Sequence, residues 1–230
     1  GIADGPVYAP LTLPTEVVTG TLKQQTLRDL RIITPSSDRV SAACRHYKSC
    51  GGCSLMHASD PFVAEWKVDI VGIALAAHGL ETELRTCLTS PPQSRRRATF
   101  SVRRTKKGAS VGFHARGSDV IIENPDCQLV DPDLIAAREM VAQLATIGGS
   151  RKGEISMNVT LCANGLDVAA YGGKELDDHL RMDLTQACEK LRLARLSWSG
   201  EVIATRLPPS QDFEGSIVDP PSGSVLQATK

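Results

Sequence analysis

The densest group of reactive side chains is a cysteine cluster at residues 44–53, which read CRHYKSCGGC. Cys44, Cys50 and Cys53 follow the spacing C-x5-C-x2-C. The glycine pair between the last two permits backbone turns that would strain other residues. Neighbouring thiolates can therefore point at one centre while backbone amides approach their sulfur atoms. This pattern predicts a metal site with three thiolate ligands close in sequence.

A closed site needs a fourth ligand from elsewhere in the chain. The candidates are the other cysteines and two histidines: Cys87, Cys127, Cys162, Cys188, His46 and His57. Cys127 is best placed, because it lies in the turn-like stretch NPDCQLVDP just before an expected helix. Cys162 ends an apolar strand, Cys188 lies inside a helix and Cys87 lies in the short strand RTCLT, positions where a thiol packs as a small hydrophobic group.

Two kinds of metal centre could be bound by such a set of thiols. Zinc takes four thiolates, usually as two separated C-x2-C pairs. A [4Fe–4S] cluster commonly takes three thiolates close in sequence and one remote thiolate, so the arrangement favours iron–sulfur. Packed or redox-active thiols without a metal are the remaining interpretation. The odd count of seven cysteines fits a disulfide framework poorly and favours a reducing cytoplasm.

A basic stretch forms the second chemical group, since residues 91–107 read PPQSRRRATFSVRRTKK. From residue 95 to residue 107, seven of thirteen side chains are basic and none is acidic. On a strand, Arg95 and Arg97 share one face while Arg96 points to the other. Their planar guanidinium groups match phosphate oxygens and predict contact with a nucleic-acid backbone. The alternative is a solvated hairpin whose charges protect a sheet edge from aggregation.

Composition limits the classes of protein to which the chain could belong. Its 230 residues carry 26 basic and 26 acidic side chains, and 41% are hydrophobic, enough for one large domain or two modest ones. Only 4% are aromatic, which argues against a broad base-stacking surface. There is no apolar run of about 18 residues and no secretory signal at the N-terminus, so no membrane association is expected.

The elements that position these groups follow an α+β pattern. The first forty residues predict short β-segments separated by turns. Helices are expected from Asp60 to Ala77, from Asp131 to Gly148 and from about Asp177 to Leu191, with Asp60 and Asp131 as caps. The first helix has a candidate buried face formed by residues three or four positions apart: Phe62, Trp66, Ile70, Ile73 and Ala77.

Strand pairs are expected between the helices. RATFSVRR pairs with ASVGFHA, and ISMNVTLC pairs with LDVAAYG across Ala163-Asn164-Gly165, where Asn-Gly is a strong hairpin signal. LARLSWS and EVIATRL follow near the end, and Trp198 in the first of these is expected in the core. The predicted arrangement is a set of hairpins with helices packed on one face.

Several linked motifs together resemble one family. In order, they are SDRVSAACRHYKSCGGCSLMH, AEWKVDIV, SPPQSRRRATFSVRR, GFHARGSDVIIENPDCQLVDP and PSGSVLQAT. They resemble the RNA uracil-C5 methyltransferases, whose ribosomal-RNA branch carries a [4Fe–4S] cluster. The resemblance implies that the cluster ligands are Cys44, Cys50, Cys53 and Cys127. It implies that Gln227 contacts S-adenosylmethionine and that the residues contacting RNA are Lys67, Arg95, Arg96, Arg97 and Arg103.

The resemblance also implies a division into domains. Residues 1–42 would be a partial N-terminal TRAM/OB-like β-barrel, and residues 43–215 an α+β central RNA-binding domain with the iron–sulfur cluster. Residues 216–230 would start the linker or strand into a C-terminal Rossmann-like methyltransferase domain, expected to be absent together with the catalytic residues. The chain alone would then bind RNA, expected to be ribosomal RNA, without methylating it.

The expected protein is a cytoplasmic monomer that takes part in methylation from S-adenosylmethionine. A rival from another class is a stand-alone nucleic-acid-binding module stabilised by zinc or an iron–sulfur cluster. An electron carrier is a third option, which the basic residues beside the cysteine loop disfavour.

Overall fold

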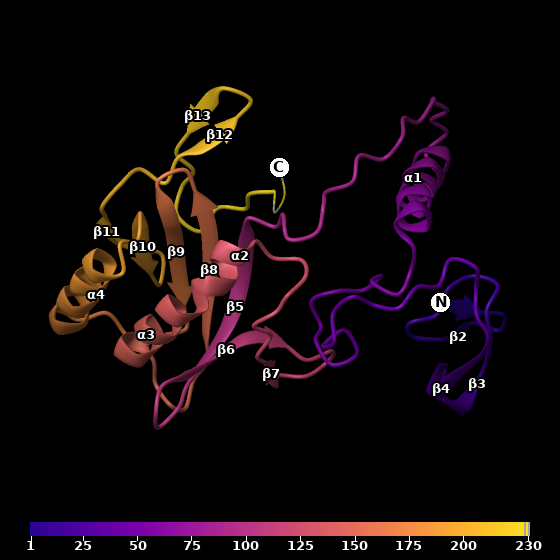
Figure 1. Ribbon diagram of the computed structural model, residues 1–230, viewed down its shortest axis with the longest axis horizontal. Helices are drawn as coiled ribbons and strands as arrows, with labels where there is room; N and C mark the ends of the chain where they lie inside the picture. Colours follow the sequence, from indigo (N-terminus) through magenta and orange to yellow (C-terminus); the bar gives the residue numbers. More distant parts are fainter. Residues whose placement is uncertain (228, 230) are drawn as a thin grey trace. The chain divides into compact units, whose positions relative to one another are not determined.

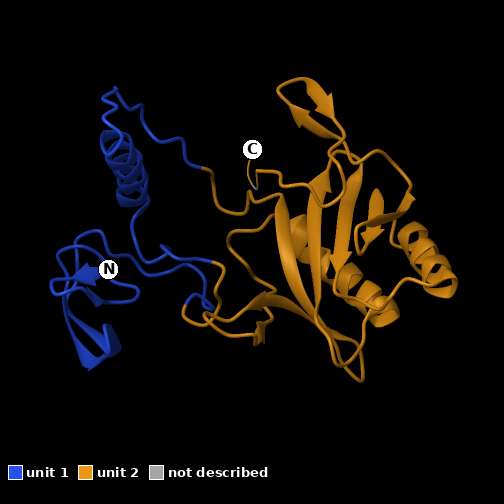
Figure 2. Ribbon diagram, turned by 180° about the vertical axis from the view of Figure 1, so that it is seen from behind, with its two compact units in different colours: residues 1–47, 53–89 blue, residues 48–52, 90–230 orange. Residues whose placement is uncertain are grey.

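The computed structural model describes residues 1–227 and 229, and the chain divides into two compact units (Figure 2). Unit 1 comprises residues 1–47 and 53–89, and unit 2 comprises residues 48–52 and 90–230. The cysteine loop, residues 44–53, thus has residues assigned to both units. The domain boundaries expected after residues 42 and 215 stay a prediction.

Unit 1 contains a small sheet and one helix. Its elements are β1 (Ile2–Ala3), β2 (Val7–Tyr8), β3 (Val17–Lys23), β4 (Thr26–Thr34) and α1 (Asp60–Ala76). The strand order is β1-β2-β4-β3, with β2 parallel to β4 and the other neighbours antiparallel. The short β-segments expected in the first forty residues are confirmed.

Helix α1 begins where the sequence predicted, although Ser59 rather than Asp60 is the N-cap, its hydroxyl accepting a hydrogen bond from the Phe62 amide. The expected buried face is wrong, because no residue of α1 is buried. Trp66 is 40% exposed and Ile73 is 70% exposed. Apolar residues such as Val71, 50% exposed, also occupy other sides of the helix, so the three- and four-residue spacing does not select one stripe.

Unit 2 is built on a seven-stranded sheet of order β11-β10-β9-β8-β5-β6-β7 (Figure 1). The strands are β5 (Arg97–Arg104), β6 (Ala109–His114), β7 (Ile121–Ile122), β8 (Ile155–Cys162), β9 (Gly165–Tyr171), β10 (Arg195–Trp198) and β11 (Glu201–Thr205). Both predicted hairpins are confirmed. Strands β9 and β10 are the parallel pair in this sheet, because α4 (Asp178–Lys190) connects them.

The helices of unit 2 pack on one face of the sheet (Figure 1). They are α2 (Pro132–Ala136), α3 (Arg138–Gly148) and α4. Asp131 is an N-cap as predicted, and Asp177 caps the third helix, but the helix expected over residues 131–148 is divided at Ala137. A separate two-stranded hairpin follows, formed by β12 (Gln211–Phe213) and β13 (Ser216–Val218).

Alternation along β5 explains the core. Ala98, Phe100 and Val102 are buried under α3, whereas Thr99 and Ser101 lie on the open face of the sheet. Trp198 is 0% exposed, as expected for a core residue, and its indole nitrogen donates to the Lys174 carbonyl at 3.0 Å. The strand expected around Cys87 does not form.

In the part of the chain that the structure describes, no helix combines the length and apolar character needed to cross a bilayer. The cytoplasmic location stays a prediction.

Candidate functional site

Arg96 lies at the centre of a polar site in unit 2. It immediately precedes β5, and only 6% of it is exposed. Its Nη1 donates to Gln211 Oε1 at 3.1 Å, and its Nε donates to the Gln227 backbone carbonyl at 3.4 Å. The guanidinium carbon lies 5.5 Å from the centroid of the Phe213 ring. Two residues predicted from sequence, Arg96 and Gln227, therefore meet although they are far apart in the chain.

Gln211 is a site residue that the sequence did not reveal. It is 4% exposed and begins β12, and its Nε2 donates to the Leu161 carbonyl at 2.9 Å. This amide thus ties Arg96 to the end of β8. Because Gln211 lies in a turn-rich stretch with no local motif, only the tertiary contact identifies it.

A cavity of about 500 Å³ opens beside Arg96. Its lining includes Arg96, Asp131, Cys162, Gln211 and Asp212. Burial is the main cause that raises the pKa of the Cys162 thiol, so this cysteine remains protonated and is a weak nucleophile. Within the described residues, no carboxylate forms an ion pair with Arg96. The cavity therefore has a buried guanidinium with neutral hydrogen-bond partners.

The chain before Gln227 is fastened to the open face of the sheet by a buried ion pair. Arg195 Nε and Nη2 donate to the two carboxylate oxygens of Asp167 at 2.9 and 2.8 Å. The same Nη2 donates to the Pro220 carbonyl at 2.8 Å, and the Ser197 and Ser222 hydroxyls share a hydrogen bond. Asp167 chiefly causes the raised pKa of Arg195. These contacts, which sequence reasoning missed, hold the segment that leads to Gln227.

The other predicted RNA-contacting residues do not line this cavity. Arg95 hydrogen-bonds through its backbone to Leu129 and Asp131. Arg97 is half-buried, and its Nε has no hydrogen-bond partner among the residues that are described. Arg103 forms an ion pair with Glu154 at 2.9 Å. Lys67 is exposed on α1 in unit 1.

The predicted cysteine ligands come from both units. In unit 2, Cys50 forms an isolated bridge with Ala115, and the Gly51 amide donates to the His114 carbonyl at 2.8 Å. A Cβ added at Gly51 would lie 3.0 Å from that carbonyl oxygen, so the loop needs glycine to approach β6 closely. The Gly52 amide donates to Cys50 Sγ at 3.4 Å, the kind of contact that stabilises a thiolate.

The remaining predicted ligands differ in burial. Cys44 and Cys127 are 9% and 8% exposed, and Cys53 is half-buried. Cys127 belongs to the hydrophobic core cluster of unit 2. Across residues 1–227 and 229, no three His, Cys, Asp or Glu side chains are grouped so as to hold a metal ion. The surroundings of Cys50 fit a thiolate ligand, but the complete four-cysteine set is not shown.

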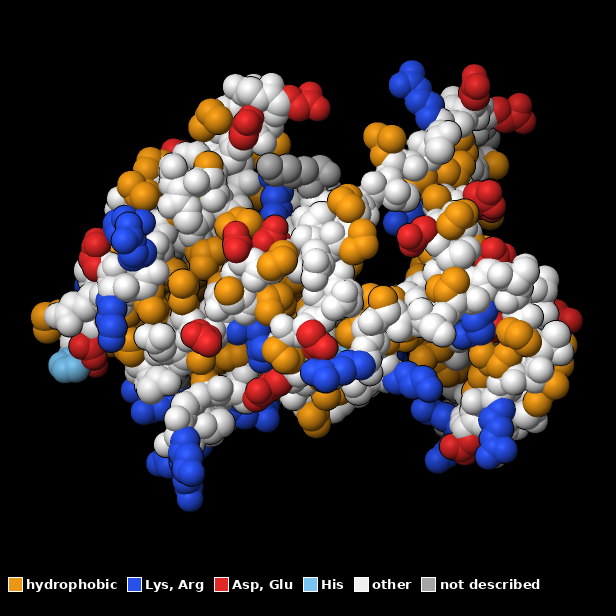
Figure 3. Space-filling model, in the orientation of Figure 1, with side chains coloured by type: hydrophobic (Ala, Val, Ile, Leu, Met, Phe, Trp, Pro, Cys, Tyr) orange, Lys and Arg blue, Asp and Glu red, His pale blue; other side chains and the backbone are white. Residues whose placement is uncertain are grey.

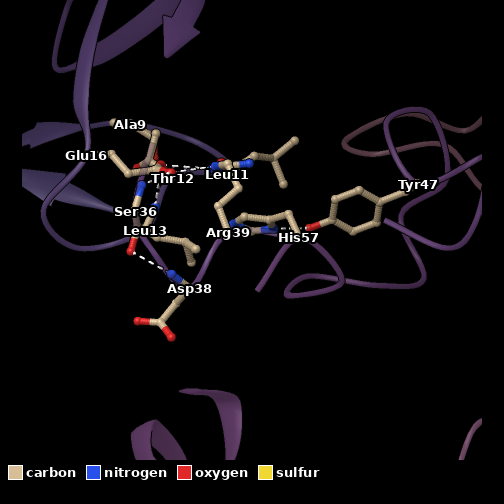
Figure 4. Close-up of polar contacts among 10 residues, drawn as sticks. All are labelled: Ala9, Leu11, Thr12, Leu13, Glu16, Ser36, Asp38, Arg39, Tyr47 and His57. Carbon is tan, nitrogen blue, oxygen red and sulfur yellow. Dashed lines mark hydrogen bonds and ion pairs between the residues drawn. The ribbon is translucent and has the colours of Figure 1, made fainter. Parts of the chain in front are cut away.

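Unit 1 has a polar cluster of its own, which the sequence did not predict (Figure 4). The Glu16 carboxylate is fully enclosed, forms an ion pair with Arg39 and accepts backbone amides from Leu13 and Ser36 at 2.9 and 3.2 Å. The hydrogen bonds from Arg39 are the main cause that lowers the pKa of Glu16 to about 2. Arg39 Nη2 also donates to the Leu11 carbonyl at 2.9 Å.

His57, a candidate metal ligand from sequence, belongs to the same unit. Its Nδ1 lies 2.6 Å from the Tyr47 hydroxyl (Figure 4). That hydroxyl donates to the Ser54 carbonyl at 2.7 Å. The imidazole Nδ1 therefore carries the proton and donates to Tyr47. Burial first, and the nearby Arg39 second, lower the pKa of His57. The neutral ring joins the loop after Cys53 to Tyr47.

Comparison with known proteins adds three relationships. A Brucella suis protein named an uncharacterized RNA methyltransferase is 35% identical over 99% of this chain and 55% of its own length. A 23S rRNA (uracil(1939)-C(5))-methyltransferase RlmD from Shewanella piezotolerans is 30% identical over 78% of this chain and 43% of its own length. No protein-family model matches. The chain thus spans about half the length of the relatives it matches.

One solved structure shares the fold. The Pyrococcus abyssi tRNA (uracil-54, C5)-methyltransferase, solved with S-adenosyl-L-homocysteine, matches 96% of this chain and 56% of its own with a TM-score of 0.62. The sequence identity is 16%, so this similarity concerns the fold alone.

These matches correct the predicted fold class. We expected a partial TRAM/OB-like barrel and a central domain that both lay outside the methyltransferase fold. Instead, 96% of the chain superposes on 56% of the solved methyltransferase chain, and a relative matches 99% of this chain, so the fold class that set these residues outside the methyltransferase fold is wrong. The expectation that the catalytic domain is missing conflicts with the same finding. Both expectations came from the family resemblance of separate short motifs, which do not determine the fold of the whole chain.

The iron–sulfur branch and the four-cysteine cluster are not shown by these matches. What the sequence similarity does establish, over nearly the whole length of the chain, is that this protein is related to the RNA methyltransferases.

Proposed function

We propose that this protein takes part in the transfer of a methyl group from S-adenosylmethionine to C5 of a uridine in RNA. The observation that carries the proposal is the 35% identity to a named RNA methyltransferase over 99% of the chain. The printed name of the Shewanella relative, which specifies uracil-C5 in 23S rRNA, supports uridine as the target and ribosomal RNA as the substrate.

The site around Arg96 supports the same function. A buried guanidinium is costly unless it is paired with an anion. The described partners of Arg96 are an amide oxygen and a backbone carbonyl, which leave donors of its planar fork for a phosphate group of RNA. Gln227 adjoins it and is the residue that resembles a contact to S-adenosylmethionine. We therefore assign RNA to Arg96 and the methyl donor to Gln227.

We assign a supporting role in RNA binding to Lys67, Arg95, Arg97 and Arg103, because they are cations within the motifs that resemble the family. The half-buried Arg97, with an enclosed Nε, is suited to donate hydrogen bonds to an anion bound on the open face of the sheet.

A [4Fe–4S] cluster held by Cys44, Cys50, Cys53 and Cys127 is the finer part of the proposal. Its support is the three-plus-one spacing and the Gly52 amide that donates to Cys50 Sγ. When bound, such a cluster would supply structural cross-linking rather than methyl-transfer chemistry. The cysteine ligands would hold the loop around Cys50 in place against the end of β6.

The experiment that tests the methyltransferase proposal uses S-adenosylmethionine with an isotopically labelled methyl group and ribosomal RNA. After nuclease digestion, mass spectrometry should find the label in 5-methyluridine. Arg96→Lys keeps the positive charge but loses the planar fork, so we expect the yield to fall at least about tenfold, equivalent to about 1.4 kcal/mol. Arg181→Lys, at an exposed ion pair with Glu201, is the matched control and should leave the yield unchanged.

Label in a base other than uracil would contradict the proposal. RNA binding with no methyl transfer would favour the stand-alone nucleic-acid-binding module instead.

A further inference from the structure

Two segments far apart in sequence bring their cations to one end of the unit 2 sheet. Val102 near the end of β5 pairs with Ile155 at the start of β8, so the β5–β6 turn lies beside the loop that precedes β8 (Figure 1). We call this surface the basic end; its residues are Arg103, Arg104, Lys106, Lys107, Arg151 and Lys152. Figure 3 shows Lys and Arg side chains gathered where this turn lies.

The basic end has a fixed backbone. Arg104 Nη1 donates to the Gly149 carbonyl at 3.1 Å, which ties the hairpin to the end of α3. The Ser150 hydroxyl accepts the amides of Lys152 and Gly153, both at 3.1 Å, and so orders the loop before β8. The side chains of Lys106, Lys107, Arg151 and Lys152 remain exposed to solvent. The cationic side chains therefore project from backbone segments that hydrogen bonds hold in place.

In the two segments that form this surface, residues 103–107 and 149–154, Glu154 is the one acidic residue, and its carboxylate is already engaged. Glu154 accepts from Arg103 at 2.9 Å through Oε2 and lies 2.7 Å from His114 Nε2 through Oε1. Six cations against one carboxylate leave a strong positive excess. If the cations served only to keep the tip of the hairpin solvated, no second segment would need to carry them. Here the β5–β6 turn and the loop before β8 both place cations at the same end of the sheet.

Glu154 also lines an open cleft of about 570 Å³ on the uncovered face of the sheet. The cleft presents the hydroxyl-bearing residues Thr99, Ser101 and Ser156 and is bordered by Gly51 and Gly52. Hydroxyl groups and cations together are the usual partners of phosphate and sugar oxygens. The residues lining this cleft are all different from those lining the Arg96 cavity.

We propose that the basic end and this cleft bind the sugar–phosphate backbone of single-stranded RNA, outside the nucleotide that is modified. This inference rests on the proposed function and adds a second contact region to it. An anionic membrane surface could also attract the cations, but it would leave the hydroxyl-lined cleft unused, so the two features together favour RNA. Contacts to phosphate make the binding independent of sequence and sensitive to salt.

The test compares double variants that each remove two exposed positive charges. Lys106→Gln/Lys107→Gln and Arg151→Gln/Lys152→Gln alter the basic end, and Lys190→Gln/Arg192→Gln alters the region around the end of α4. Fluorescence anisotropy with a labelled oligouridine gives the dissociation constant of each full chain at several salt concentrations. Circular dichroism checks that all variants are folded.

Each basic-end variant should reduce the slope of log Kd against log salt by about 1.4, since a single-strand contact contributes about 0.7. Between about 50 and 200 mM salt, the variant should then lose about sevenfold less affinity than the unaltered chain. The control pair should keep the original slope.

Failure of the unaltered chain to bind oligouridine at low salt would overturn the proposed function together with this inference. Binding by the unaltered chain with equal slopes in the basic-end and control variants would overturn the inference alone. Loss of binding to phosphatidylglycerol vesicles, with oligouridine binding unchanged, would assign the basic end to a membrane and also overturn it.

Discussion

At the scale of single residues, Glu16 and Arg39 illustrate how an enclosed ion pair couples stability to pH. Glu16 is fully enclosed and hydrogen-bonded to Arg39 and to backbone amides, so its charged form is stabilised in the folded chain. Its pKa falls from 4.5 to about 2. A carboxyl with a lowered folded-state pKa stabilises the fold fully above its unfolded value and loses that contribution as pH falls through the folded value. The sensitive range is therefore between about pH 4.5 and pH 2.

We expect Glu16→Gln to lower the free energy of unfolding by about 3 kcal/mol at pH 7, because Arg39 loses its enclosed counter-charge. Near pH 2 the variant and the unaltered chain should differ little, since the native carboxyl is then half protonated or more. Urea unfolding followed by circular dichroism at several pH values measures this difference. Glu81→Gln, at an exposed position of the same unit, should change neither value. An equal loss at pH 2 and pH 7 would assign the effect to packing instead of charge.

At the scale of elements, β6 contacts the loop around Cys50 and depends on Gly112 for its close pairing with β7. A Cβ at Gly112 would overlap the backbone carbonyl oxygen of Ile122, in the strand that pairs with β6. At the end of the same strand, the His114 carbonyl accepts the Gly51 amide. A shift in β6 would therefore disturb the loop around Cys50.

Gly112→Ala should destabilise the chain by about 1–3 kcal/mol, because the backbone of the neighbouring strand must move. Gly108→Ala is the matched control, since nothing lies within 4 Å of a Cβ there and its φ is outside the left-handed region. It should cost nothing or stabilise by about 0.4–1 kcal/mol. The urea midpoints of the two variants give the comparison, and equal midpoints would rule out the close approach to Ile122.

Elements with local signals were predicted well. Asp131 caps its helix, and Asn164-Gly165 turns the β8–β9 hairpin, because these signals act within a few residues. Contacts between distant segments had no such signal, and so Gln211 beside Arg96 and the Arg195–Asp167 pair were missed. The burial of α1 was predicted wrongly, because its apolar residues are not confined to one side of the helix.

At the scale of the whole molecule, the sequence motifs pointed to the RNA methyltransferases, to which the chain is similar, but not to how the chain relates to their fold. The motifs that resemble the family are informative because they follow one another in the same order and with similar spacing. The arrangement of those segments within one methyltransferase fold became evident only from the structural match over 96% of the chain. Short motifs were an unreliable guide to the fold, because a fold is determined by many long-range contacts.

The proposed cluster makes a prediction at this scale, since its ligands come from both units. Anaerobically purified protein should be brown and contain about four iron atoms per chain. Cys127→Ser should abolish the iron and weaken RNA binding, because the loop around Cys50 loses its remote anchor. Metal analysis and visible absorbance provide the measurement.

Cys188→Ser is the control, since Cys188 is also buried but lies in α4 outside the proposed ligand set. It should retain the iron. Iron retained in Cys127→Ser would remove that residue from the set, and colourless protein with bound zinc would replace the cluster by a zinc site.

The placement of the two tryptophans has a practical consequence. Trp66 is partly open to solvent in unit 1, whereas Trp198 is sealed in the core of unit 2. Each unit thus contains one tryptophan, and the two differ in polarity of surroundings and in access to a quencher such as acrylamide. Emission from the chain consequently reports on the two units separately, without any added dye.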